Sequence, residues 1–454
     1  MSEASLEDKI NQAGGPVKML RSSNAGAYPF PIPSEYTNWR DEQRAWHETA
    51  VLFDQSHHMT DLYVQGPDAL ALVSHVGVNK FTGFGRNKAK QFVTCNEAGQ
   101  IISDSILFGH DDDRFSLVGN PFGLDWLEYQ AKTGGYDVEI TRDERTLANQ
   151  RGRLIFRFQL QGPAALEIAA KASGGSLPRI KFFNIGEFEI AGHAVRALNH
   201  TMVGVPGHEN TGLEMWGPME HGPEVWAALC AAGEEFGLRQ GGAIAYSTTA
   251  LESGWYGMYV PAIFSGDDTL PYRRHLRATG FEGRASLGGS FDAPRIEDFY
   301  YTPFDVGYAH IVNFDHDFIG RDALLERRDE PSSKKVWLRW NDEDVTRLLA
   351  GGLLPDEEAR TRYLSVPYGV YNTFQYDTVT SGDRTVGVSN RTGYTVNVGH
   401  WFSLAIVDED IARDGADVVV VWGEPDGGAT KANDALHRQT EVRAKVSLNS
   451  PVRP

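Results

Sequence analysis

LYVQGPDALALVS at residues 62–74 and FQLQGPAALEIAA at residues 158–170 share one pattern: an apolar strand, then Gln-Gly-Pro, then an apolar stretch that includes Ala-Leu. In each copy the apolar residues predict a strand that ends at Gly-Pro, and we expect the proline in the first turn of a helix. The spacing that follows places apolar side chains on one helical face. Two copies in matching contexts indicate a duplicated α+β unit. Coincidence is the alternative, since many strands end at Gly-Pro.

The elements around the two copies are predicted from turn and breaker residues. Residues 188–198, FEIAGHAVRAL, predict a hairpin with Ala-Gly-His at its turn. Residues 222–237 predict an amphipathic helix that begins at Gly-Pro and ends at glycine. The charged, breaker-rich stretch RDEPSSKK at residues 328–335 indicates a domain boundary. Beyond it, short apolar runs such as VGHWFSLAIV and ADVVVVWGE predict a small antiparallel sheet or barrel.

Length, charge and cysteine content limit the class of protein. The 454 residues suffice for two or three domains, and 41% hydrophobic with 23% charged residues is ordinary globular composition. The formal net charge of -18 argues against nucleic acid and anionic membranes as partners. Cys95 and Cys230 are far apart, which argues against a disulfide framework or structural zinc and fits a reducing compartment. Without a signal peptide or a spanning apolar run, we expect a soluble, cytoplasmic protein.

Several common catalytic motifs are absent. The sequence has no GxxxxGK[ST] loop, no HExxH pair and no GxSxG elbow, and GFGRNK at residues 83–88 lacks the third glycine of a dinucleotide loop. His57 and His58 are adjacent, so on a strand they would face opposite sides, and we expect no metal between them. Which of the two lines a pocket stays open. The chemistry is therefore expected to come from a bound organic cofactor and a few polar side chains.

Several stretches together resemble the glycine-cleavage T-protein superfamily of folate-dependent one-carbon transferases. FDQSHHMTDLYVQGPDAL is similar to its N-terminal signature, and KAKQFVTCNEAGQIISDSILF, HENTGLEMWGP, TALESGW and FDHDFIGRDAL follow in the family's order, over about residues 45–325. Within the superfamily the chain is more similar to the tetrahydrofolate-dependent vanillate and syringate O-demethylases. The shared stretches are MLRSSNAGAYPFP, NWRDEQRAW, KTGGYDVEI, AYSTTALESGW and VVVVWGE, so this resemblance spans nearly the whole chain.

The resemblance implies an α+β fold of three domains, a cloverleaf with tetrahydrofolate at its centre and a small C-terminal antiparallel β-barrel. We place the duplicated α+β units of the folate-binding core at residues 1–150 and 151–330, and expect these domains to be discontinuous. The barrel is placed at residues 331–454. The resemblance leaves open whether the protein is a monomer or a homodimer.

The resemblance also implies roles for individual residues. Cleaving an aryl ether needs a nucleophile, here N5 of tetrahydrofolate, an aligned carbon, and help for the departing phenolate. By resemblance Tyr246 donates to that phenolate, whose conjugate acid has a pKa near that of tyrosine; the alternative is a structural tyrosine bonded to backbone. Asp104, in IISDSILF, would lie beside the N5/N10 edge of the folate, or else be a hairpin-end aspartate. Glu214 would accept hydrogen bonds from the 2-amino group and N3–H of the pterin.

Further candidate residues follow from the same resemblance. Trp255 is expected to stack on the folate or to pack in the core. Gln55 and Gln161 complete the expected cofactor-binding set. Tyr28, Phe30, His58 and Asn120 are the expected substrate-binding residues.

Departures from the family's patterns bear on the substrate. T-proteins usually carry an arginine where this chain has Ala250, which argues against an aminomethyl-lipoyl substrate. Demethylases of aromatic acids hold the substrate carboxylate with an arginine just after the strand RFSLVG, where this chain has Asn120. Because an unpaired buried carboxylate is costly, we expect a neutral aryl ether; simple retention of an ancestral asparagine is the alternative. Phe30, where related demethylases can place a tyrosine, also favours a less polar pocket.

The specific expectation is a methylenedioxyphenyl compound such as the lignan sesamin, cleaved to a catechol with transfer of the methylene group to tetrahydrofolate. A methoxyaryl substrate, which would give methyl-tetrahydrofolate, stays open. The alternatives are demethylation of vanillate- or syringate-type acids and demethylation of a small aliphatic donor. A folate-binding protein of iron–sulfur assembly is a third class, disfavoured because ALESGWYGMYVPAIF contains no cysteine.

Overall fold

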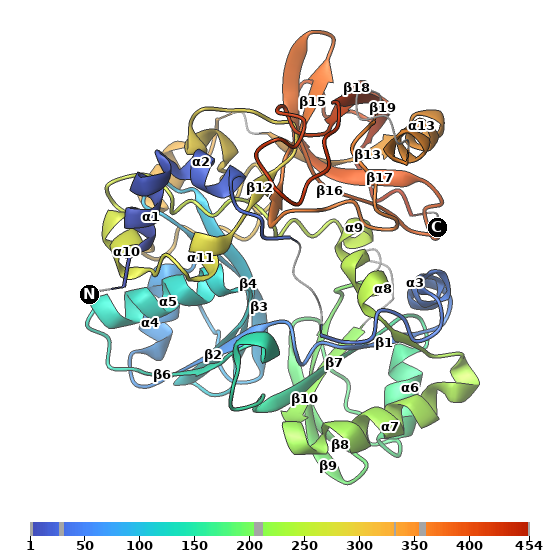
Figure 1. Cartoon of the computed structure of the whole chain (residues 1–454). Coiled ribbons are helices and arrows are strands. Elements are labelled where there is room, and N and C mark those ends of the chain that lie inside the picture. Colours follow the sequence, from blue (N-terminus) through green and yellow to red (C-terminus); the bar gives the residue numbers. More distant parts are fainter. Residues whose placement is uncertain (1–2, 27–30, 204–211, 331–332, 354–359, 453–454) are drawn as a thin grey trace.

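The computed structural model describes residues 3–26, 31–203, 212–330, 333–353 and 360–452 (Figure 1). Tyr28 and Phe30 lie outside the described residues. Two α+β lobes and a barrel surround a shared centre (Figure 1). This confirms the predicted α+β cloverleaf with a C-terminal antiparallel β-barrel.

The first α+β lobe is built on a five-stranded sheet with the order β3-β4-β5-β2-β6. Alternate side chains of β2 and β5, such as Leu62 and Leu117, are buried in one core with Leu72 of α4. The backbone N–H of Leu6 donates to the carbonyl of Leu276 at 2.8 Å, so both an N-terminal segment and a later one cover this lobe. The elements are β2 (Thr60–Gln65), α4 (Ala69–Val76), β3 (Lys88–Cys95), β4 (Ile101–Gly109), β5 (Arg114–Gly119), α5 (Pro121–Thr133) and β6 (Glu139–Asp143), with α1 (Leu6–Ala13), α2 (Pro16–Arg21), α10 (Leu270–His275) and α11 (Phe281–Arg284).

The second α+β lobe has a six-stranded sheet with the order β11-β1-β7-β10-β9-β8. Strand β1, from early in the chain, lies between β7 and β11 and pairs parallel with β11. The predicted hairpin is β8–β9, and the predicted helix is α7 followed by a 3-10 turn that ends at Gly237. The elements are α3 (Trp39–Glu48), β1 (Val51–Asp54), β7 (Ile155–Gln161), α6 (Ala165–Ala172), β8 (Ile185–Ile190), β9 (His193–His200), β10 (Gly212–Pro218), α7 (Gly222–Gly233) and β11 (Arg239–Gly241).

The repeated Gln-Gly-Pro motif forms the strand-to-helix turn of both lobes, as the sequence predicts. Gly66 has φ +147° and Gly162 has φ +129°, and a Cβ on Gly66 would lie 2.4 Å from the carbonyl oxygen of Asp137. The placement of the prolines in the first helical turn is wrong, because the helices begin at Ala69 and Ala165. Each alanine N–H donates instead to the preceding glycine carbonyl, at 3.1 and 3.0 Å, so each proline is the second residue of a β-turn.

The last lobe is a closed barrel with the strand order β13-β17-β16-β15-β18-β19. Its neighbouring strands are antiparallel, and Val336, Leu338, Val420 and Trp422 lie in its core. The barrel strands are β13 (Lys334–Trp340), β15 (Asp377–Ser381), β16 (Arg384–Tyr394), β17 (Trp401–Val407), β18 (Asp417–Trp422) and β19 (Thr440–Ser447), with α13 (Asp342–Gly352) at one side. Short elements join the lobes: α8 (Ala243–Ser247), α9 (Thr249–Ser253), β12 (Leu287–Gly288), α12 (Arg321–Glu326) and β14 (Phe374–Gln375).

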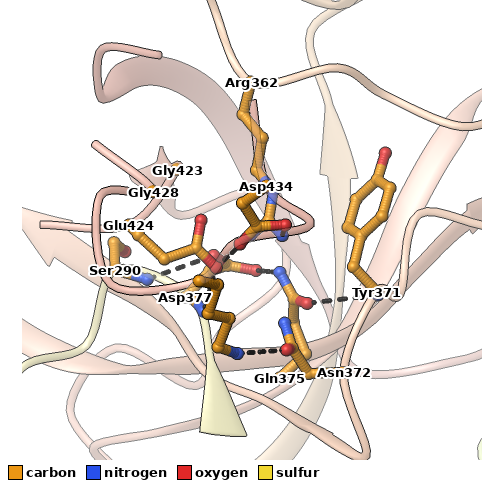
Figure 2. A network of polar contacts seen from close by, with 12 residues as sticks. Ser290, Arg362, Tyr371, Asn372, Gln375, Asp377, Gly423, Glu424, Gly428 and Asp434 are labelled. Carbon is orange, nitrogen blue, oxygen red and sulfur yellow. Dashed lines mark hydrogen bonds and ion pairs between the residues drawn. The ribbon is translucent and has the colours of Figure 1, made fainter. Parts of the chain in front are cut away.

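A buried polar network fixes the barrel to the first lobe (Figure 2). Arg362 forms an ion pair with Glu424, and Glu424 accepts a hydrogen bond from the backbone N–H of Gly289 at 3.1 Å. Asp377 accepts from the backbone N–H of Ser290 at 3.4 Å. Because Gly289 and Ser290 follow β12, these contacts hold the loop after β12 against the barrel.

Lys431 extends this network to the wall of the molecule's centre. Its ammonium group donates to the carbonyl of Leu287 at 2.8 Å and to Oδ1 of Asn372. Gln375 donates to Asp377 at 3.1 Å (Figure 2). The segment that carries Asn372 and Gln375 is therefore tied to the barrel loop and to β12 together.

None of the helices in the described part of the chain combines the length and the apolar character that crossing a membrane requires.

Candidate active site

A cavity of about 1530 Å³ lies where the three lobes meet. Most of its accessible lining is apolar, which suits an aromatic ligand. Seven of the predicted site residues line it: Gln55, His58, Asp104, Asn120, Glu214, Tyr246 and Trp255. The cavity therefore brings together residues from all three predicted roles.

Tyr246 lies on α8 and reaches a turn that follows β1. Nε2 of Gln55 donates to its hydroxyl oxygen at 3.1 Å, and Nε2 of His58 lies 3.0 Å from the same atom. His57 and His58, of which the sequence left open which one lines a pocket, lie in the turn between β1 and β2. His58 lines the cavity, whereas Nδ1 of His57 lies 2.8 Å from the hydroxyl of Thr146.

Burial decides the protonation of this pair. It raises the pKa of the Tyr246 hydroxyl well above 10. It also lowers the pKa of His58 to about 3. Both side chains are therefore neutral near neutral pH, and Tyr246 is a proton donor there rather than a phenolate.

Asp104 is buried on β4 and its Oδ2 accepts three hydrogen bonds. The donors are Gln91 at 2.7 Å, the indole N–H of Trp255 at 2.8 Å and the hydroxyl of Tyr308 at 2.7 Å. Burial raises the pKa of Asp104 to about 6, although these donors favour the charged form. Its other oxygen, Oδ1, is buried and has no hydrogen-bond partner among the described residues.

Glu214 lies on β10 within a buried chain of charges. Arg157 of β7 pairs with Oε1 of Glu214 and, at 2.5 Å, with Asp61 of β2. Oε2 of Glu214 lies 2.8 Å from Nε2 of His200. Burial alone would raise the pKa of Glu214, but Arg157 and His200 outweigh it and lower the pKa to about 2. Glu214 is therefore an ionised acceptor at the cavity wall.

Comparison with known proteins decides the family. Residues 21–260, more than half of the chain, match the family described as the GCVT N-terminal domain. The chain belongs to this aminomethyltransferase family. It is 42% identical over 445 residues to the syringate O-demethylase of Sphingobium sp. (strain NBRC 103272 / SYK-6), with 98% of this chain and 95% of the relative covered. It is 29% identical over 420 residues to the sesamin methylene transferase of Sinomonas sp. (strain No.22), covering 89% and 88%.

A solved member of the family shares the fold. The crystal structure of glycine cleavage system aminomethyltransferase T from Bartonella henselae superposes with a TM-score of 0.62 at 18% identity, covering 95% of each chain. The predicted resemblance is confirmed, and the chain is an enzyme of the folate-dependent one-carbon transferase class. Enzymes of this aminomethyltransferase family use tetrahydrofolate as the one-carbon acceptor.

The cavity of this family member offers unsatisfied groups that fit a folate. Oδ1 of Asp104 and Oε1 of Gln55 are buried without a hydrogen-bond partner among the described residues, and both side chains line the cavity. The N–H groups of a pterin ring are the kind of donor that such acceptors require. Within the described residues, no group of three or more His, Cys, Asp or Glu side chains could hold a metal ion.

The other predicted residues differ in their positions. Trp255 is 41% exposed and tied by its indole N–H to Asp104, which leaves ring surface at the cavity for stacking. Asn120 caps α5, since its Oδ1 accepts from the backbone N–H of Phe122 at 3.2 Å. Gln161 is buried at the end of β7, accepts from Gln159 at 3.1 Å, and is not among the described residues that line the cavity.

Sequence reasoning missed four residues that position the site. Arg157 and His200 hold Glu214, and Gln91 and Tyr308 hold Asp104. A signal existed for Arg157, since an arginine in the apolar run IFRFQLQ needs a buried acid. The other three carry no local signal, because their partners come from distant strands and loops.

Proposed function

We propose that this enzyme removes the one-carbon group of an aryl ether, chiefly an aryl methyl ether, and delivers it to tetrahydrofolate. The observation that carries the proposal is the neutral Tyr246 hydroxyl, held by Gln55 and His58 at the wall of a largely apolar cavity. The 42% identity to a protein named syringate O-demethylase supports methyl ethers as the substrate class.

Glu214 and Asp104 are the residues proposed to hold the cofactor. Bound tetrahydrofolate supplies the N5 nucleophile that accepts the one-carbon unit. Glu214, ionised by Arg157 and His200, is suited to accept from the 2-amino group and N3–H of a pterin. Asp104 is proposed to lie near the N5/N10 edge, where its charge would stabilise positive charge that develops there. Trp255 offers a stacking surface beside it.

Tyr246 is proposed to protonate the departing oxygen. Cleavage of the bond between the aryl oxygen and the carbon leaves an electron pair on the oxygen, which takes the hydroxyl proton of Tyr246. Gln55 donates to the tyrosine oxygen and so stabilises the negative charge that this transfer leaves. Burial disfavours that charge and so favours reprotonation of Tyr246. The proton that N5 would lose on gaining the one-carbon group balances the proton that the phenol keeps.

A methylenedioxyphenyl substrate such as sesamin is the second candidate. Asn120 carries no charge and uses its oxygen to cap α5, so it offers no cation to a carboxylate. The 29% identity to a protein named sesamin methylene transferase also supports a methylenedioxyphenyl substrate. Both cysteines are free, which supports our proposal of a reducing, cytoplasmic location.

The test is turnover with tetrahydrofolate and three ethers: syringate, sesamin and a neutral methoxyphenol. Mass spectrometry identifies the aromatic product and the folate species. A demethylated phenol with methyl-tetrahydrofolate supports the main proposal, and a catechol from sesamin with methylene-tetrahydrofolate supports the second. Turnover of none of the three would contradict both.

A further inference from the structure

We propose that Lys335 of the barrel is a positioning residue for Asp104: it holds the segment that carries Trp255 and keeps the Asp104 carboxylate ionised. The inference deepens the proposed function and rests on the role that this function gives to Asp104 near the folate. Lys335 lies on β13, whereas Asp104 lies on β4 of the first lobe. The barrel therefore acts on a group that belongs to another lobe.

Lys335 is fixed at the cavity by its contact with the end of α9. Its ammonium group donates to the carbonyl of Gly254 at 2.9 Å, and its side chain lines the cavity. Gly254 has φ +70°, the left-handed conformation with which α9 ends. The next residue, Trp255, donates its indole N–H to Oδ2 of Asp104 at 2.8 Å. Lys335 therefore holds the residue directly before one of the donors to Asp104.

A second residue of β13 secures the same end of α9. The indole N–H of Trp337 donates to the carbonyl of Leu251 at 2.9 Å. A Cβ on Gly254 would lie 2.3 Å from the ring of Trp337, so the close approach requires glycine. Because Lys335 and Trp337 are two positions apart on a strand, they point to the same face of β13. Strand β13 therefore holds the segment before Trp255 at two points.

Lys335 also lies over the second donor to Asp104. Its ammonium nitrogen is 5.9 Å from the centroid of the Tyr308 ring, and the Tyr308 hydroxyl donates to Oδ2 of Asp104 at 2.7 Å. A cation over an aromatic ring is attracted by the electrons of that ring, and it makes the hydroxyl of a phenol a stronger donor. Two of the three donors to Asp104 are therefore linked to one lysine.

The charge of Lys335 acts on Asp104 as well. Burial raises the pKa of Asp104 to about 6, and the positive charge of Lys335 opposes this rise together with the hydrogen bonds. Tyr259 and Tyr308 also face Asp104, but burial raises the pKa of each well above 10. Burial likewise raises the pKa of Cys95, which adjoins Tyr259. These three groups are neutral near neutral pH, so Lys335 supplies the charge that stabilises the carboxylate.

The experiment removes the charge of Lys335 and follows the ionisation of Asp104 itself. Isotope-labelled aspartate carboxyl carbons are titrated by NMR, and the signal of Asp104 is assigned as the one that Asp104→Asn lacks. In Lys335→Met we expect the titration midpoint of Asp104 to rise by about one pH unit, because a nearby cation and the anchor of a donor are lost. The acid limb of kcat/KM should move with it. The loss in kcat/KM should be about fivefold near pH 6 and negligible near pH 9.

Two further variants separate the charge of Lys335 from its hydrogen bond. Lys335→Gln keeps a donor for the carbonyl of Gly254 and loses the charge, so the midpoint of Asp104 should again rise. This variant also decides the question if Lys335→Met does not fold. Lys335→Arg keeps both the charge and a donor, and it should restore the wild-type midpoint.

Lys334→Met is the matched control. Lys334 is the neighbouring residue on β13, its side chain is 44% exposed, and it pairs with Glu409 at 3.4 Å. Its replacement should leave the midpoint of Asp104 unchanged.

An unmoved midpoint in both Lys335→Met and Lys335→Gln, or an equal rise in Lys334→Met, would overturn the inference. A loss of kcat/KM that is the same at every pH would also overturn it, because a merely structural role gives that result. If the wild-type enzyme demethylates no aryl ether, the proposed function itself fails, and the NMR titration still decides whether Lys335 controls Asp104.

Discussion

The hydroxyl of Tyr246 lies 3.0 Å from Nε2 of His58, a residue 188 positions earlier in the chain. The sheet explains this proximity. Strands β1 and β11 pair in parallel, with Val51 beside Arg239, so both end at the same edge of the sheet. His58 follows β1 and Tyr246 follows β11. The two side chains therefore meet in the cavity because two parallel strands deliver them to the same place.

Tyr246→Phe should lower kcat by about 100- to 10,000-fold, the range expected for loss of a positioned general acid. The phenyl ring keeps the packing against Phe53, and only the hydroxyl is lost. The dissociation constant for tetrahydrofolate, measured by calorimetry, should hardly change. Retention of most activity would assign the protonation of the leaving oxygen to another group.

Glu214→Gln should make the protein less stable in a pH-dependent way. The pKa of Glu214 is lowered from 4.5 to about 2 in the folded protein, so the unfolded state binds more protons between these values. The resulting stability is present above the unfolded pKa of 4.5 and is lost as pH falls toward 2. At pH 7 the loss in unfolding free energy should be about 3 kcal/mol.

Urea denaturation of both proteins across this pH range is the measurement. The two stability curves should converge at acid pH, where Glu214 is protonated in either state. A difference that is constant with pH would show that packing, and not the ion pair with Arg157, accounts for the effect. Weaker binding of tetrahydrofolate at pH 7 would support the proposed role in holding the pterin.

Asp104 should set the acid limb of the pH–rate profile. Its pKa is raised to about 6 by burial, so activity that needs the carboxylate falls as pH drops below about 6. The Tyr308 hydroxyl donates to the charged form. Tyr308→Phe should therefore raise the pKa and move the limb of kcat/KM to higher pH, by about one to two pH units. An unmoved limb in this variant would show that another group controls the profile.

The sequence predicted the features that recur locally. Two Gln-Gly-Pro turns with positive-φ glycines mark the two lobes, and alternating apolar runs mark the barrel. Motif resemblance found Tyr246, Glu214 and Asp104, which the structure places at one cavity. The predicted helix starts were about two residues too early, because proline is accepted both in a β-turn and in the first turn of a helix, and the sequence pattern does not distinguish them.

The features that could not be predicted from the sequence depend on pairing between segments that are far apart in the chain. The insertion of β1 between β7 and β11 cannot be predicted from a four-residue apolar strand, yet it brings the turn that carries His58 to Tyr246.

The polar network in Figure 2 joins the barrel to the segment that carries Asn372, so breaking it should affect both stability and the cavity. Lys431→Met should lower the unfolding free energy by about 2–4 kcal/mol, because the carbonyl of Leu287 and Oδ1 of Asn372 lose a buried donor. Lys445→Met is the matched control on the barrel surface. Its exposed pair with Asp417 should contribute no more than about 1 kcal/mol.

Asn372, which accepts from Lys431, lines the cavity. We therefore expect Lys431→Met to raise KM for the aryl substrate, and Lys445→Met to leave it unchanged. Urea denaturation and steady-state kinetics on the two variants separate the effects. A loss of stability without a change in KM would mean that the network only fastens the barrel. A loss of stability together with a higher KM would show that Lys431 of the barrel holds the part of the cavity lining that includes Asn372 in place.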